Sequence, residues 1–265
     1  MSSILTHYLD QFLTFVLVLT RVGSLLMTLP VLGTATVPMQ VRALLAVGVS
    51  LILTPLFWAQ PIPAPENLLV LGAMLVREAI LGLALGLAVL ILLSGMQLAG
   101  QIISQTSGMT LADVANPTFD TSVPLFSHIL EMLALAIFFL VGGHRQVIDA
   151  LLRSFTWMPP GSSRLPDDLV EALSAVTAHS FEIGIRAAAP VMVALLLATL
   201  VVALISRTLP QLNAVAVGLN FNSLIVMGVF SMSLGSAAWI FQDELQESIN
   251  SIAVTITPFR SASAP

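Results

Sequence analysis

Long apolar runs, separated by short polar or proline-rich breaks, dominate the pattern of this chain. Each run is 19 or more residues long and holds few charged side chains. The runs cover approximately residues 11–29, 41–59, 68–103, 123–142, 169–206 and 213–241. Because a helix of about 20 apolar residues crosses a bilayer, this pattern predicts an all-α polytopic membrane protein.

Two of the runs are too long for a simple membrane span. The runs 68–103 and 169–206 would form helices of about 54–57 Å, whereas the hydrocarbon core of a bilayer is about 30 Å thick. We therefore expect long, kinked helical hairpins that are steeply tilted, broken, or partly packed against protein. Pro190 favours a kink in the second long run, and Pro55 favours one in the run 41–59.

Three longer segments fall outside the apolar runs. We expect a polar connection at about 104–122 and a polar insert at about 144–168 within one membrane domain, 1–242. We expect the remainder, 243–265, to open with a short acidic, helix-like stretch and to end as a disordered tail.

Composition narrows the function further. Charged residues make up 9% of the chain, against about 25% in a soluble domain, which rules out a separate soluble catalytic domain. Nine scattered arginines and a net charge of −5 make no basic stripe for nucleic acid. The absence of cysteine excludes disulfides and thiol chemistry.

No motif for catalysis, metal binding or cofactor binding stands out. The four histidines are too far apart in sequence to form a local metal motif. A nucleophile elbow, a phosphate-binding glycine loop and a paired-carboxylate motif are all missing from the sequence. We therefore expect no enzyme, no metal and no cofactor.

Ionisable side chains inside apolar runs are costly in a membrane and are therefore candidates for function. Six residues qualify: Arg21, Arg77, Glu78, Glu131, Glu182 and Arg186. We favour ion pairing that locks assembly over a proton or ion pathway. Glu182 and Arg186 are four residues apart and can pair on one helix face. Glu131 alone has no arginine nearby in the sequence.

Small residues recur along the first long run. Gly82 and Gly86 are four residues apart, and Gly95, Ala99 and Gly100 continue the series. Such a face lets helix backbones approach closely. We interpret it as internal packing rather than as a partner contact.

The stretch 100–124 is more apolar than a solvated loop. It holds only two charges, Asp113 and Asp120, and keeps several apolar side chains. It is either an ordinary connection or a segment in a protein-lined cavity, where non-helical backbone is tolerated at membrane depth.

Three stretches together resemble the FliR family of flagellar export-gate proteins, whose injectisome counterparts are the SctT family. They run from Arg21-Val22-Gly23-Ser24 to Thr54-Pro55, from Gly100-Gln101-Ile102-Ile103 to Gly142-Gly143-His144, and from Pro210-Gln211-Leu212-Asn213 to Gly218. The third supplies the structural motif residues Pro210, Gln211, Asn213 and Gly218. The family commonly has a proline shortly after this glycine, and this chain has Asn220 instead.

The resemblance implies a function that composition alone does not supply. Such proteins assemble with FliP-like and FliQ-like subunits, and with an FlhB-like subunit, in the bacterial inner membrane at the flagellar basal body. The assembly forms the pore through which unfolded substrates leave the cytoplasm in type III secretion. The closeness of the motifs favours a flagellar machine over an injectisome.

The resemblance also implies a sealing loop. The loop that closes the family's pore corresponds to about 105–122 here. Its candidate residues are Gln105, Gly108, Met109, Leu111, Asp113, Asn116, Pro117, Phe119 and Asp120. The main alternative for the whole chain is a small secondary transporter or channel, which would need a solute site near broken helices.

Overall fold

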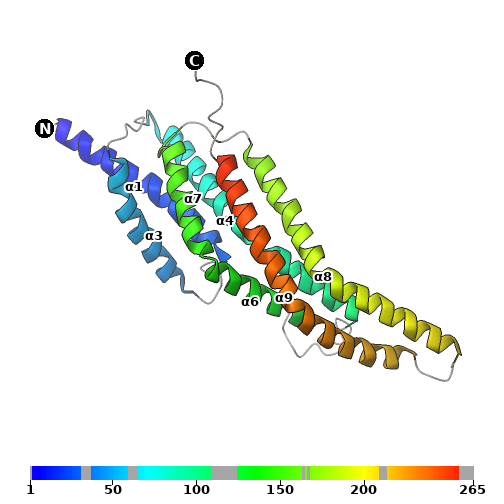
Figure 1. Ribbon diagram of the computed structural model, residues 1–265. Helices are drawn as coiled ribbons and strands as arrows, with labels where there is room; N and C mark the ends of the chain where they lie inside the picture. Colours follow the sequence, from blue (N-terminus) through cyan, green and yellow to red (C-terminus); the bar gives the residue numbers. More distant parts are fainter. Residues whose placement is uncertain are drawn as a thin grey trace, which may run out of the picture. The chain divides into compact units, whose positions relative to one another are not determined.

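The computed structural model describes residues 2–30, 37–58, 65–108, 124–162, 165, 168–208 and 214–256. Within these ranges the chain forms helices and no strand. Figure 1 shows their order, which is α1 (Ser2–Thr28), α3 (Met39–Leu53), the 3-10 turn η1 (Thr54–Phe57), α4 (Leu68–Ser107), α6 (Leu125–Leu140), α7 (Gly143–Trp157), α8 (Leu169–Thr208) and α9 (Ala214–Ile256).

The predicted all-α membrane architecture is confirmed. Among the described residues, five helices are long and apolar enough to cross a membrane, namely α1, α3 with η1, α4, α8 and α9. The pair α6 and α7 would add a sixth if it is counted as one broken span. Gly142 interrupts this pair, with a φ of +76° that favours glycine.

The two longest apolar runs form single helices. Helices α4 and α8 each have 40 residues, which corresponds to about 60 Å. Pro190 lies inside α8, which continues through it and is bent along its length in Figure 1. At Pro55 the α-helix does end, because α3 stops at Leu53 and the proline lies in η1.

The first part of the polar insert that we expected at about 144–168 is helical. Residues 143–157 form the amphipathic helix α7, and Val147, Leu151 and Phe155 bury one side of it. Their spacing of four residues places them on one helical face. Polar residues between them obscure this spacing when only average hydrophobicity is considered.

The acidic, helix-like stretch that we expected from residue 243 continues a longer helix. Helix α9 continues without interruption to Ile256, so the acidic stretch that begins at Asp243 is part of a long helix. The final residues, 257–265, on which we predicted disorder, lie outside the described residues.

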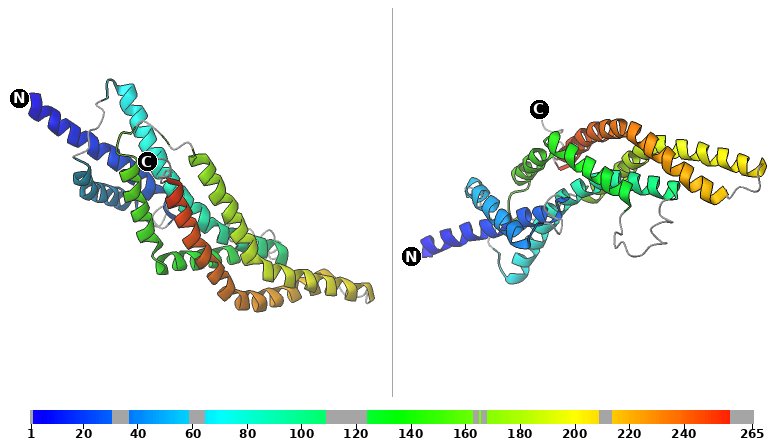
Figure 2. Two further views of the ribbon diagram at one scale, coloured as in Figure 1. Left: turned by 45° about the horizontal axis from the view of Figure 1, so that its top comes forward. Right: turned by 90° about the horizontal axis from the view of Figure 1, so that it is seen from below.

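The helices fall into two compact units. One contains residues 1–91, 142–176 and 249–265, and the other contains residues 92–141 and 177–248. In the first unit α1 lies beside α3, and Phe57 of η1 packs on Phe155 of α7 with ring centroids 5.0 Å apart. In the second unit α8 and α9 lie side by side in both views of Figure 2, and Phe126 packs on Phe230.

Candidate functional site

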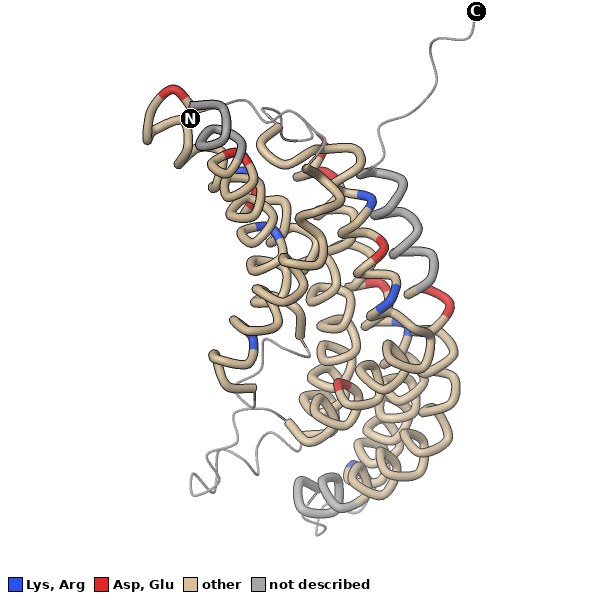
Figure 3. Tube along the Cα trace, turned by 90° about the vertical axis from the view of Figure 1, so that its left-hand side faces the viewer, with Lys and Arg blue, Asp and Glu red and all other residues tan. Residues whose placement is uncertain are grey.

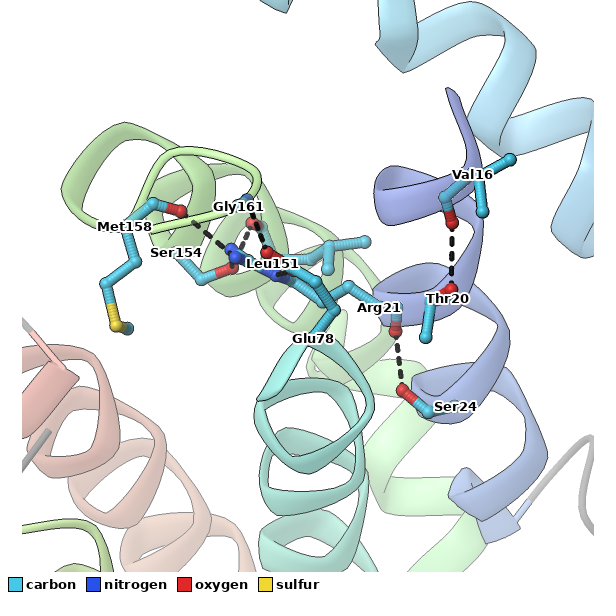
Figure 4. Close-up of polar contacts among 9 residues, drawn as sticks. All are labelled: Val16, Thr20, Arg21, Ser24, Glu78, Leu151, Ser154, Met158 and Gly161. Carbon is cyan, nitrogen blue, oxygen red and sulfur yellow. Dashed lines mark hydrogen bonds and ion pairs between the residues drawn. The ribbon is translucent and has the colours of Figure 1, made fainter. Parts of the chain in front are cut away.

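The first unit has a buried arginine where α1, α4 and α7 meet. Figure 4 shows the Arg21 guanidinium pointing from α1 toward Glu78 of α4 and toward the C-terminal end of α7. Its Nε donates to Glu78 Oε2 at 2.6 Å, Nη1 donates to Ser154 Oγ at 3.2 Å, and Nη2 donates to the Met158 carbonyl at 3.0 Å. One side chain therefore connects three segments that are far apart in sequence.

Glu78 completes this network. While Oε2 accepts the hydrogen bond from Arg21, Oε1 accepts one from the backbone N–H of Gly161 at 2.9 Å. Gly161 has a φ of +82°, so the turn at Pro159-Pro160-Gly161 takes a conformation that favours glycine. The carboxylate thereby fixes the turn that follows α7 against α4.

The environment of the pair is fully desolvated. The Arg21 side chain is 0% exposed and that of Glu78 is 2% exposed, and the guanidinium carbon lies 4.2 Å from the ring centroid of Phe155. A buried charge is tolerated when it is paired and hydrogen-bonded, and an arginine over an aromatic ring gains a further attraction. Because these groups are engaged with one another, the arrangement stabilises packing rather than providing a reactive group.

Glycines bring α1 and α4 together beside this network. A Cβ built on Gly82 would overlap Ser24 Oγ and the Arg21 carbonyl oxygen, and one on Gly86 would overlap Thr28 Oγ1. The small-residue face predicted for this run therefore packs inside the chain, as we interpreted it from the sequence. The close approach leaves room for the Arg21 and Glu78 side chains to meet.

Glycines also bring helices into close contact in the second unit. A Cβ on Gly95 of α4 would lie 2.5 Å from the Ser180 carbonyl oxygen of α8, and one on Gly184 would lie 2.7 Å from the Gly95 carbonyl oxygen. A Cβ on Gly100 would overlap the backbone of Ser127 in α6. Helices α6 and α8 thus both contact the C-terminal part of α4 backbone to backbone.

A second ionic cluster joins α8 to α9. Arg186 places Nη2 2.6 Å from Glu182 Oε1 on its own helix and Nη1 2.8 Å from Glu244 Oε1 on α9. His179 Nε2 lies 2.7 Å from Glu244 Oε2. Figure 3 shows how few charged residues occur along the long helices.

The charged side chains of α8 are exposed in this chain, although the sequence places them inside an apolar run. Glu182 is 49% exposed and Arg186 is 54% exposed. Only Glu244 is largely covered, with 12% of its side chain exposed. The physical reason is that these charges lie on the outer side of α8, away from the glycine contact with α4.

The other predicted site residues that the structure describes belong to neither cluster. Arg77 and Glu131 are both half-buried. Gln105 is exposed near the end of α4, and its carbonyl accepts the Gly108 N–H at 3.2 Å, where Gly108 has a φ of +77°. Gly218 lies in α9. The predicted residues outside the described ones are Met109, Leu111, Asp113, Asn116, Pro117, Phe119, Asp120, Pro210, Gln211 and Asn213.

Sequence reasoning missed two members of the α8–α9 cluster, His179 and Glu244. A signal for His179 was present, because His179, Glu182 and Arg186 have the i, i+3, i+7 spacing of one helical face. No local spacing could identify Glu244, which lies 58 residues beyond Arg186. The same holds for Ser154, which lies 133 residues beyond Arg21.

Comparison with known proteins identifies the family. The family described as "Bacterial export proteins, family 1" matches residues 12–248. The chain belongs to this family. The match includes Arg21, Glu78 and the whole α8–α9 cluster, so both ionic networks lie within the export-protein domain.

Curated relatives of this export protein cover most of its length. It is 29% identical to the flagellar biosynthetic protein FliR of Caulobacter vibrioides over 87% of this chain and 92% of that protein. It is 28% identical to FliR of Escherichia coli over 81% of each. The secretion system apparatus protein SsaT of Salmonella typhimurium is 25% identical over 58% of this chain and 60% of its own length. The predicted FliR resemblance is confirmed.

Proposed function

We propose that this chain is a subunit of the flagellar type III protein export gate. The observation that carries the proposal is the family match over residues 12–248, together with relatives named FliR that align over more than four-fifths of both chains. The match to SsaT is shorter, which favours a flagellar machine over an injectisome.

The proposed gate contains other membrane subunits. The 40-residue helices α4 and α8 exceed the thickness of a bilayer, and many apolar side chains of α8 are exposed, among them Leu196 and Leu200. Helices of this length bury such surface by packing on neighbouring helices. We assign this role to FliP-like and FliQ-like subunits, with an FlhB-like subunit beside them, in the inner membrane at the basal body.

In this proposal the chain is non-catalytic and helps to form the pore by which unfolded flagellar substrates enter the export channel. The segment 104–122, which includes Gln105 and Gly108, would seal the pore at rest. A sparsely charged, partly apolar segment excludes water and ions from a narrow lumen, and methionine adapts to an irregular gap.

Co-purification tests the proposal. The tagged chain is co-expressed with the FliP-like, FliQ-like and FlhB-like proteins of the same bacterium and is isolated in mild detergent. We expect a complex that contains this chain and the FliP-like and FliQ-like subunits, and we expect the chain expressed alone to aggregate or be degraded. A long-lived, monodisperse monomer that ignores these proteins would contradict the proposal.

A further inference from the structure

The four residues His179, Glu182, Arg186 and Glu244 form an ionic stripe on the outer side of α8 and the adjacent part of α9. Within the stripe Glu244 is covered and Glu182 faces outward, with 12% and 49% of their side chains exposed. The stripe is not part of the Arg21–Glu78 network and is not needed for the glycine contacts that join α8 to α4.

The surroundings of the stripe suit neither water nor lipid. Phe181 and Ile185, which flank Glu182 on α8, are each more than half exposed. Water would leave these two apolar side chains solvated, and lipid would leave Glu182 and Arg186 in hydrocarbon, which is costly. A mixture of apolar and charged groups of this kind is typical of a surface that another protein covers.

The charge balance of the stripe indicates what the covering protein brings. Glu244 is contacted through one oxygen by Arg186 and through the other by His179. Glu182 also contacts Arg186, through its Oε1. The Nδ1 atom of His179 lies 3.9 Å from the other Glu182 oxygen, Oε2. The His179 Nδ1 is therefore beyond hydrogen-bond distance of Glu182, and the two carboxylates share one arginine.

The rest of this unit does not supply the missing cation. The only other arginine among its described residues is Arg207, which lies 21 positions or about 32 Å farther along α8. The other titratable groups with described side chains are His128 and Glu131 on α6 and Asp243 on α9. The chain contains no lysine.

We propose that the ionic stripe docks a helix of another membrane subunit, and that this helix presents a lysine or arginine to Glu182. Phe181 and Ile185, which are four residues apart and share one side of α8, would pack against that helix beside the ion pair. This inference rests on the proposed function, because it takes the partner from the subunits that assemble with the chain.

Isosteric removal of one charge, with a matched control, tests the proposal. Glu182→Gln is compared with Asp149→Asn, since Asp149 and Arg153 form another exposed i, i+4 pair, at 2.8 Å on α7. The partner subunits are co-expressed, and the amount of these subunits recovered per captured chain is measured. Glu182→Gln is expected to lower this amount about tenfold or more, because it leaves an interfacial cation unpaired. Asp149→Asn is expected to match the wild type. Equal recovery with Glu182→Gln would overturn the proposal.

A photo-crosslinking side chain at position 185 gives a second measurement that does not depend on the charge variant. We expect an adduct with another subunit, in which the mapped peptide contains a lysine or arginine. An adduct within this chain, or no adduct in a complex that is otherwise intact, would overturn the proposal.

The wild-type chain separates a failure of this inference from a failure of the proposed function. If wild-type chain captures no subunit at all, the proposed function fails as well; if it captures them and only the stripe experiments fail, the proposed function stands.

Discussion

Arg21 and Glu78 are 57 positions apart in the sequence and form an ion pair with an N–O distance of 2.6 Å, in which neither side chain is more than 2% exposed. The pair joins α1 to α4 beside Gly82, where a Cβ on α4 would overlap α1. Through Ser154 and Gly161 it also holds the end of α7 and the turn after it.

Breaking this pair is expected to destabilise the protein strongly. Arg21→Ala leaves the Glu78 carboxylate buried without its cation. Glu78→Ala leaves the Arg21 guanidinium buried without its carboxylate. Loss of one partner of a buried pair costs about 3–5 kcal/mol. We expect each single variant to lower the unfolding temperature of the detergent-purified complex and the amount of chain in the membrane.

The double variant Arg21→Met with Glu78→Leu serves as its control. It removes both charges and keeps apolar volume, so we expect it to be more stable than either single alanine variant. A double variant that is as damaged as the two single variants together would indicate that lost volume, not the unpaired charge, is responsible.

Substitution by alanine at two glycines of the same helix, α4, is expected to change stability differently. In Gly100→Ala the new Cβ overlaps the Ser127 backbone, and forced overpacking costs about 1–3 kcal/mol. A Cβ at Gly72 meets nothing within 4 Å, so Gly72→Ala is expected to be neutral or to stabilise by up to about 1 kcal/mol. Thermal unfolding of the two purified variants checks this, and equal loss in both would refute the packing explanation.

Arg186→Ala is expected to loosen the contact between α8 and α9. It leaves Glu182 and Glu244 without their shared cation, whereas Arg153→Ala removes only the exposed pair with Asp149 on its own helix. Exposed pairs of this kind contribute about 0.3–0.5 kcal/mol. Hydrogen exchange around residue 244 should rise in Arg186→Ala, and should match the wild type in Arg153→Ala. No increase in Arg186→Ala would show that the cluster does not hold the two helices together.

The long helices could be predicted from the sequence because apolar runs without internal breaks leave few alternatives in a membrane. The sequence predicts less well those stretches whose average polarity hides a buried helical face or the continuation of a helix. The buried face of α7 is hard to see in the sequence because Asp149 lies between its buried Val147 and Leu151, and His144 and Arg145 precede them. At the other end, Asp243 and Glu244 suggested a boundary, although α9 continues past them.

The ionic networks were only partly predictable. The sequence identified Arg21 and Glu78 as costly in a membrane but could not pair them, because the contact depends on how α1 crosses α4. By contrast, Glu182 and Arg186 pair through local helical spacing, as expected. Their exposure was not predictable, since it depends on which side of α8 faces α4.

Deleting residues 108–118 is expected to open the proposed seal without preventing assembly. If the segment closes the pore sterically, purified complex with the deletion should conduct ions in planar bilayers, where wild-type complex stays closed. Asp113→Asn or Asp120→Asn alone should have a smaller effect, because an apolar seal does not depend on one charge. Equal tightness of both complexes, or a deletion that fails to assemble, would mean that the segment is a structural connection.

Export itself tests the central claim most directly. In a strain that lacks this chain, the amount of early flagellar substrates is measured in the culture medium and in the cytoplasm. The proposed function predicts that these substrates remain in the cytoplasm, that no filament forms, and that the wild-type chain on a plasmid restores both. A strain without the chain that still exports flagellar substrates at the wild-type level would contradict it.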